Sequence, residues 1–344
     1  MSSKRWLVVF ISFAAALGAS LYIVFTSWPH QHAPPALPLL AHLVLLGVAL
    51  LELSARGWKL KLSALTLRVP LRFGTAVRAS VGGDFAAAIT PARTGAEPAR
   101  FLILSEAGMP RTDVILVVFA ELFLEMLSLV IVVVVLAIVF KGSGAVLGSM
   151  IGLVGGYATF VIGLGVVGVM LSRRNASGPP PTWASRLGLH AGRWRVIQRS
   201  LRQLKAGIAG LKHARIQFAV MALLSSVAHV LLRLATLPII VYAYGVPRGS
   251  VPLAPLVLWP LALFYGGVVA PVPAGGGFIE VAFKATLGGT IPGRFLGGAL
   301  IWWRFYTFYL FLILGALVAG NTVLRAVRGN GEPDDETVAA RELA

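Results

Sequence analysis

Two arginines lie beside helix-breaking residues in the segment TPARTGAEPAR, residues 90–100. We expect Pro91 and Gly95 to stop a helix here, which leaves backbone N–H and C=O groups without helical partners. Free N–H groups at a helix N-terminus attract anions, and the guanidinium groups of Arg93 and Arg100 add bidentate recognition of phosphate or carboxylate. The segment therefore predicts the tip of a site for a negatively charged headgroup.

A second segment, PVPAGGGFIE at residues 271–280, combines similar residue types. Each segment has a proline, a glycine four positions later and then a glutamate, which is Glu97 in the first segment and Glu280 in the second. The second tip contains Pro271, Pro273, Gly275, Gly276 and Gly277. If the two segments enter a membrane from opposite sides, they form an inverted repeat whose broken helices meet at a site near the midplane.

Further charged residues interrupt long apolar stretches of the chain. Glu121 and Glu125 share one helix face because they are four residues apart, and Arg233 and Arg304 lie in other apolar runs. Such residues usually face a cavity or one another. Interior ion pairs that hold helices together, such as Glu121 with Arg233 or Arg304, remain the alternative to a substrate site. The candidate substrate-binding residues are Arg93, Glu97, Arg100, Glu121, Glu125, Arg233, Gly275, Gly276, Gly277, Glu280 and Arg304.

The composition is that of a membrane protein. The mean hydropathy is +0.84 and only 12% of the 344 residues are charged. The net charge of +17 is better explained by cytoplasmic basic loops than by nucleic-acid binding. The chain has no cysteine and no HExxH, GxSxG or P-loop motif, so we expect no metal, no cofactor and no enzymatic activity.

Apolar runs of about 20 residues, long enough for a ~30 Å hydrocarbon core, predict an all-α polytopic protein with about six full spans. The expected spans are residues 6–26, 37–54, 114–140, 145–171, 216–244 and 295–320. Residues 172–215 carry ten Lys or Arg and no acid, and residues 54–78 after the second span carry six, so both are expected in the cytoplasm. The segments 73–107 and 250–291 must then each return to the side from which they came. They are predicted to be re-entrant hairpins of opposite orientation, although paired tilted crossings satisfy the same topology.

We expect one transmembrane domain, residues 1–320, followed by a soluble, disordered tail, residues 321–344. Within the basic loop 172–215, the segment RWRVIQRSLRQLKAGIAGLK at 193–212 has its apolar residues on one helical stripe and its basic residues beside it. This pattern is typical of an amphipathic helix lying on an anionic leaflet. A topology signal without a membrane-bound helix is the alternative.

Two blocks of the sequence resemble a known family. GDFAAAITPARTGAEPARFLIL at 83–104 and PVPAGGGFIEVAF at 271–283 are similar to the G-D-x6-P-x-R-x-G-E-x-x-R and P-x-P-G-G-x-G-x-x-E blocks of the lysylphosphatidylglycerol synthase transmembrane family. That family includes the flippase half of the bacterial multiple peptide resistance factor. Here Ala96 precedes Glu97 and Ala274 replaces a glycine. The resemblance implies a lipid-related function. With 344 residues, the chain is expected to lack the aminoacyl-transferase domain of the two-part members of this family.

The expected function is therefore that of a flippase-like transporter in the inner membrane of a bacterium, with both termini in the cytoplasm. Its partners would be membrane lipids with anionic or amphiphilic headgroups, such as phospholipids, aminoacyl-phospholipids or lipid-linked glycans and hopanoids. Homo-oligomerisation is left open. An intramembrane enzyme acting on a lipid-linked substrate, or a scaffold that recruits a cytosolic transferase, are the alternatives.

The predicted topology can be tested with single cysteines, because the natural sequence has none. Cysteines placed within 172–215 and in the tail after residue 330 should resist an impermeant thiol reagent in intact cells. They should react once the membrane is permeabilised, which serves as the control. Labelling of either position from outside would contradict the cytoplasmic placement.

Overall fold

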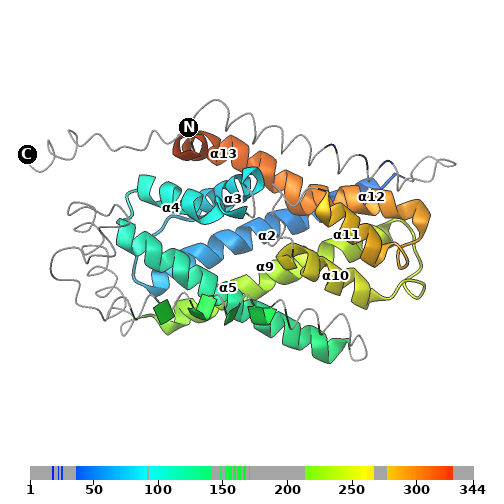
Figure 1. Cartoon of the computed structure of the whole chain (residues 1–344), viewed down its shortest axis with the longest axis horizontal. Coiled ribbons are helices and arrows are strands. Elements are labelled where there is room, and N and C mark those ends of the chain that lie inside the picture. The colour runs from blue at the N-terminus through cyan, green and yellow to red at the C-terminus, as the bar shows by residue number, and fades with distance from the viewer. Residues whose placement is uncertain are drawn as a thin grey trace, which may run out of the picture.

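The computed structural model describes residues 36–90, 93–140, 214–266 and 277–327, together with scattered positions within 18–25 and 148–170. Over these residues the chain is built from helices and contains no strand (Figure 1). The amphipathic segment 193–212 and the chain beyond residue 327 lie outside the described residues. So do most of the expected first span at 6–26 and about half of the expected span at 145–171.

Four of the described helical segments are long and apolar enough to cross a membrane. They are α2 (Leu39–Thr66), α5 (Arg111–Val139), α9 (Ile216–Ala243) and the continuous segment Gly293–Thr322. These segments correspond to four of the six expected spans. The all-α, multi-pass class predicted from composition is thereby confirmed, and the number of six spans stays a prediction.

The second span was predicted too short. Helix α2 does not end near residue 54 but continues to Thr66, so that Arg56 and Lys59 lie within the helix and are buried. The apolar side chains of Leu60, Leu62 and Ala64 are also buried, so α2 remains packed against its neighbours beyond Arg56 and Lys59. Arg56 and Lys59 therefore belong to the protein interior rather than to a basic loop.

Each of the two segments predicted to be re-entrant hairpins contains a pair of short helices. Residues 73–107 form α3 (Phe73–Ile89) and α4 (Ala96–Glu106), and residues 250–291 contain α10 (Leu253–Gly266) and α11 (Phe278–Leu287). Each helix has 10–17 residues, or at most about 26 Å at 1.5 Å per residue, which is less than a ~30 Å hydrocarbon core. The two pairs extend inwards from opposite ends of the molecule (Figure 1). Their depth in a bilayer remains a prediction.

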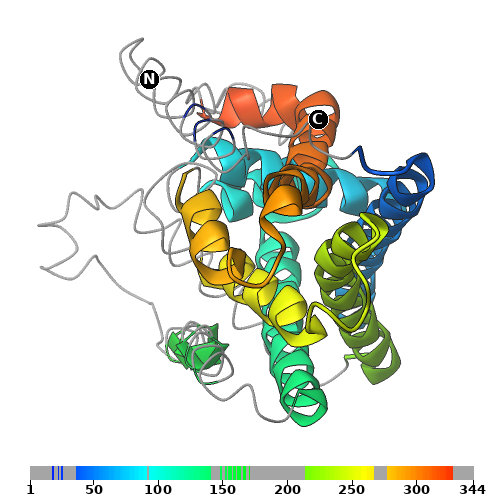
Figure 2. The ribbon, with the colours of Figure 1, turned by 90° about the vertical axis from the view of Figure 1, so that its right-hand side faces the viewer.

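The helices pack around α2 and α9, which lie side by side along much of their length (Figures 1 and 2). Helix α9 also contacts α5 and α10, and helix α13 (Leu310–Val327) packs against α3 and α4. Between α12 (Gly293–Arg304) and α13 the chain forms one π-helical turn, η5 (Phe305–Tyr309). Such turns locally widen a helix and often occur at functional sites.

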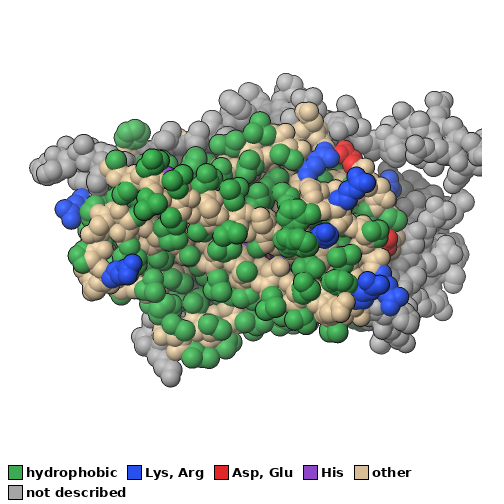
Figure 3. Space-filling model, turned by 180° about the vertical axis from the view of Figure 1, so that it is seen from behind, with side chains coloured by type: hydrophobic (Ala, Val, Ile, Leu, Met, Phe, Trp, Pro, Cys, Tyr) green, Lys and Arg blue, Asp and Glu red, His purple; other side chains and the backbone are tan. Residues whose placement is uncertain are grey.

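The outer surface supports a membrane environment. Large apolar side chains are exposed on the long helices, including Leu50 on α2, Val134 on α5 and Leu224 on α9. On the face seen in Figure 3 such side chains cover the middle of the molecule, and most Lys and Arg side chains gather towards one end. In water this surface would be unfavourable, whereas in a lipid bilayer it is the expected one.

Two glycines of α13 allow a test of its packing against α3. A Cβ atom on Gly315 would collide with the carbonyl oxygen of Val81 and lie 2.8 Å from the Cβ of Phe85, whereas a Cβ on Gly320 would meet nothing within 4 Å. We expect Gly315→Ala to lower the free energy of unfolding by about 1–3 kcal/mol. Gly320→Ala, the matched control, should be neutral or stabilising by up to about 1 kcal/mol. Equal melting temperatures for the two purified variants would contradict this packing.

Candidate functional site

One face of α2 carries three charged residues. Each is costly to bury in apolar surroundings unless an opposite charge lies beside it. Glu52, Arg56 and Lys59 are four and three residues apart, which places them along one helical stripe, and all three are buried. The Nη1 of Arg56 lies 2.6 Å from the Oδ2 of Asp84 on α3. Lys59 contacts two carboxylates of α5, and Glu52 lies 3.9 Å from the Nε of Arg233 on α9. Each residue of the stripe is thus paired with a different helix.

Lys59 is the centre of a compact group that we call the α5 ion cluster, formed by Lys59, Glu97, Arg100, Glu121 and Glu125. The Nζ of Lys59 lies 2.8 Å from Glu121 and 2.9 Å from Glu125. The other oxygen of Glu121 accepts a 2.9 Å hydrogen bond from Arg100, which also lies 3.2 Å from Glu97. These short contacts join α2, α4 and α5 in the manner of interior ion pairs.

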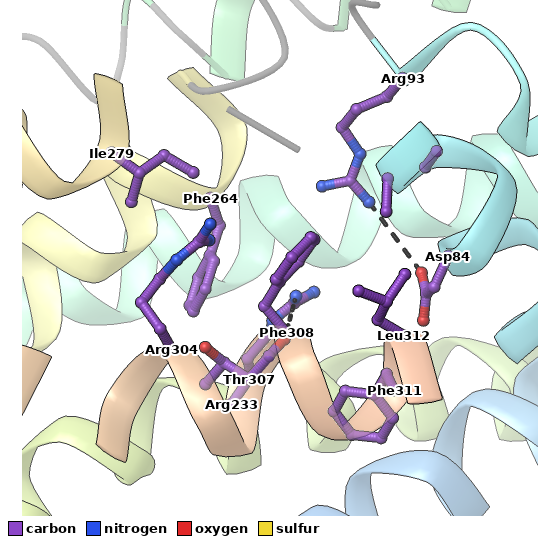
Figure 4. Close-up of a pocket in the computed structure, with 12 residues that line it drawn as sticks. Asp84, Arg93, Arg233, Phe264, Ile279, Arg304, Thr307, Phe308, Phe311 and Leu312 are labelled. Atoms are coloured by element: carbon purple, nitrogen blue, oxygen red, sulfur yellow. Dashed lines mark hydrogen bonds and ion pairs between the residues drawn. The ribbon is translucent and has the colours of Figure 1, made fainter. Parts of the chain in front are cut away.

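A separate polar cavity lies where the two helix pairs meet (Figure 4). Its lining residues are Asp84, Ala87, Ala88, Arg93, Arg233, Phe264, Ile279, Arg304, Thr307, Phe308, Phe311 and Leu312. They come from several parts of the chain. These are the C-terminal end of α3, the residue Arg93 beyond it, α9, the C-terminal part of α10, the first turn of α11, the π-helical turn and the two helices that flank this turn. Its volume of about 30 Å³ leaves room for about two water molecules.

Three guanidinium groups face this cavity from three different parts of the fold (Figure 4). Arg93 lies 4.0 Å from Asp84 and its side chain is 37% exposed. Arg233 donates a 3.0 Å hydrogen bond to the carbonyl oxygen of Thr307, while its buried Nε makes no hydrogen bond with any described residue. Arg304 lies 2.9 Å from Glu280. Arg93 and Arg233 are therefore paired with carboxylates only at long distances, 4.0 Å to Asp84 and 3.9 Å to Glu52.

The local backbone explains how Arg93 and Glu280 reach their places. Arg93 has a φ of +57°, a left-handed conformation that costs energy in a residue other than glycine and lets the chain turn sharply between α3 and α4. Gly277 has a φ of +77° and immediately precedes α11, so this position favours glycine. The first turn of α11 then presents Ile279 to the cavity and buries Glu280 against Arg304.

Aromatic rings hold two of the arginines in position. The guanidinium carbon of Arg233 lies 4.3 Å from the ring centre of Phe264, and that of Arg304 lies 4.4 Å from the ring centre of Phe308. Both rings line the cavity. Stacking of this kind suits the planar guanidinium group and would not hold a lysine in the same way.

The predicted site residues therefore fall into two separate groups. Arg93, Arg233 and Arg304 line the cavity, and Glu280 is paired behind one of them. Glu97, Arg100, Glu121 and Glu125 belong to the α5 ion cluster, so Glu121 pairs with Lys59 and Arg100 rather than with Arg233 or Arg304.

Gly277 and Gly95 lie at the two helix starts, and Gly95 donates a 2.9 Å hydrogen bond to the hydroxyl of Thr90. Pro91, Pro271, Pro273, Gly275 and Gly276 lie outside the described residues.

Sequence reasoning did not place Glu52, Arg56 and Lys59 in the interior. Their spacing along one helix face was visible, but the basic residues around them suggested a cytoplasmic loop. The signal that could have found them is the set of apolar residues Leu60, Leu62, Ala64 and Leu65, which continue along the same helix beyond Lys59.

The fold and site define a multi-pass helical membrane protein with a polar cavity between two oppositely directed helix pairs. The model of the lysylphosphatidylglycerol synthase TM region matches residues 5–315, which is most of the 344-residue chain. The chain therefore belongs to this family, which associates it with membrane lipids. No curated protein and no solved structure matches the chain.

The α5 ion cluster makes a specific prediction about stability. Among the described residues, Lys59→Met removes the ion-pair partner of Glu125 and one of the two ion-pair partners of Glu121. It should lower the free energy of unfolding by about 3–5 kcal/mol. The double variant Lys59→Met/Glu125→Gln should recover part of this loss, because Arg100 still neutralises Glu121. Thermal unfolding of the purified proteins measures both effects. A double variant no more stable than the single one would show that charge pairing is not what Lys59 contributes.

Proposed function

We propose that this protein is a flippase-like transporter that takes the polar headgroup of a membrane lipid into the cavity and lets it cross between leaflets. The observation that carries the proposal is the convergence of two helix pairs, entering from opposite ends, on one cavity lined by Arg93, Arg233 and Arg304. Broken helices that meet at a polar midplane site are typical of transporters built from inverted repeats. Membership of a lipid-related membrane family supports a lipid as the transported molecule.

The arginines and the phenylalanines of the cavity have different roles in the proposed binding. Guanidinium groups on three elements can surround a phosphate from several sides, and each can donate two parallel hydrogen bonds. Phe264 and Phe308 keep two of them oriented and lower the local dielectric, which strengthens every charge interaction inside. Acyl chains would remain in the surrounding bilayer, in contact with the apolar outer faces of the helices.

A headgroup is larger than the two water molecules for which the cavity has room. Binding therefore requires the helix pair α3/α4 or α10/α11 to move away from the segment Arg304–Leu312. Opening one pair while the other stays closed would expose the same arginines first to one leaflet and then to the other.

We place the protein in the cytoplasmic membrane of a bacterium, with its termini on the cytoplasmic side.

Replacing Arg233 by lysine tests whether the guanidinium groups bind substrate. Arg233→Lys keeps the positive charge near Glu52 but loses the planar fork and the stacking on Phe264. We expect transport of a fluorescent phospholipid in proteoliposomes to fall about tenfold or more, in line with the loss of a charge-assisted hydrogen bond. The melting temperature should change little.

Arg78→Lys is the matched control for this experiment. Arg78 lies on α3 but pairs with Glu106 and Thr322 away from the cavity. Its variant should transport at the rate of the natural protein. If Arg233→Lys also transports at that rate, the cavity is not the transport site.

A further inference from the structure

The buried charges around the cavity do not cancel. We define the cavity cluster as the cations Arg56, Arg93, Arg233 and Arg304 with the anions Glu52, Asp84 and Glu280, which are the charged residues of the described chain that line the cavity or pair with its lining. Four guanidinium groups face three carboxylates, so the cluster has an excess of one positive charge. In a low-dielectric interior an uncompensated charge is costly and favours a ligand of opposite sign.

The opposite excess lies in the α5 ion cluster, whose carboxylates make no ion pair with the described residues that line the cavity and act on them only at longer range. There three carboxylates face two cations, and the group is bound together by contacts of 2.8–3.2 Å. Its members do not line the cavity. The twelve charges of the two clusters thus cancel when they are taken together. Taken separately, the cavity cluster has one excess positive charge and the α5 ion cluster has one excess negative charge.

The available hydrogen-bonding groups have the same bias. Asp84 is the only carboxylate among the described residues that lines the cavity, and Arg56 already holds it at 2.6 Å while Arg93 faces its other oxygen. An ammonium group entering the cavity would find no carboxylate without a cation beside it. By contrast, the Nε of Arg233 makes no hydrogen bond with any described residue, and Arg93 has only a 4.0 Å contact. Among the described side chains that line the cavity, donor groups are therefore more available than carboxylates. The carboxylate oxygens that also lack a hydrogen bond, those of Glu52 and Glu280, belong to residues that do not line the cavity and that face Arg233 and Arg304.

We propose that the cavity selects headgroups whose only charge is a phosphodiester of net charge −1, and that it discriminates against headgroups that also carry an amine. This inference rests on the proposed transport function and narrows its substrate class. One phosphodiester neutralises the excess of the cavity cluster, whereas a zwitterionic headgroup leaves that excess in place and a cationic one increases it. Neutral hydroxyl groups on the headgroup are compatible with the site because they add no charge.

The test compares three acyl-labelled lipids in proteoliposomes that contain the full-length chain. The lipids are phosphatidylglycerol, phosphatidylethanolamine and lysyl-phosphatidylglycerol, which carry net charges of −1, 0 and +1 on the headgroup. Chemical quenching of the label in the outer leaflet measures the transport rate. We expect phosphatidylglycerol to cross at least about tenfold faster than either amine-bearing lipid, the factor that corresponds to one charge-assisted hydrogen bond.

A charge variant then shows whether this selectivity originates in the cavity. Arg93→Gln removes the excess charge, and its long contact with Asp84 means that little pairing is lost. It should reduce the preference for phosphatidylglycerol to less than about threefold by slowing that lipid. Arg78→Gln is the matched control: its side chain is also 37% exposed, it belongs to the same helix pair, and it lies away from the cavity. The control should keep the full preference.

The outcomes separate this inference from the proposed function. Equal transport of all three lipids, or faster transport of an amine-bearing lipid, would overturn the selectivity while leaving transport established. Transport of none of them would overturn the proposed function itself. Binding of glycerol 3-phosphate by the purified protein, together with no transport of any lipid, would assign the cavity to a soluble phosphate ester instead of a lipid. A preference that survives Arg93→Gln would place the selectivity outside the cavity and refute the charge argument.

Discussion

The charged stripe on α2 is the constraint on which the rest of the structure depends. Three ionised side chains in the packed interior of a membrane helix are tolerated only if each finds an opposite charge. Glu52, Arg56 and Lys59 do so with three different helices, α9, α3 and α5. The stripe therefore fixes which faces of these helices turn inwards. Apolar packing alone would not specify this in a bilayer, because lipid tails are as apolar as the helix surfaces.

The two ends of this stripe behave differently. At the Lys59 end, the contacts with Glu121 and Glu125 are short and join helices of one compact group. At the Glu52 end, Arg233 lies 3.9 Å from its carboxylate, and Arg93 beyond it lies 4.0 Å from Asp84. Short, buried pairs resist rearrangement, whereas long ones can exchange a carboxylate for another anion at a smaller cost. We infer that the α5 ion cluster is a fixed frame and the cavity is the adaptable part.

The helix breaks account for the position of the cavity. Helices α3 and α10 stop inside the molecule, and their ends, together with the first turn of α11, surround the arginines at the π-helical turn. A helix that ends within the bilayer, as predicted for both pairs, has backbone groups that only protein, water or a ligand can satisfy. A polar cavity between two helix pairs is thus a direct consequence of breaks in both pairs, and movement of either pair changes its size.

The sequence by itself determined the membrane class, the four long spans that are described and the two segments that break in the middle. These features depend on local composition, since apolar length, proline and glycine act within a few residues of one another. It also marked Arg93, Arg233 and Arg304 as unusual. It could not tell which charges meet, and it assigned Arg56 and Lys59 to a loop. Pairing across helices depends on how α2, α3, α5 and α9 are rotated and packed, and only the tertiary structure decided that Arg100 and Glu121 join Lys59 while the three other arginines face one cavity.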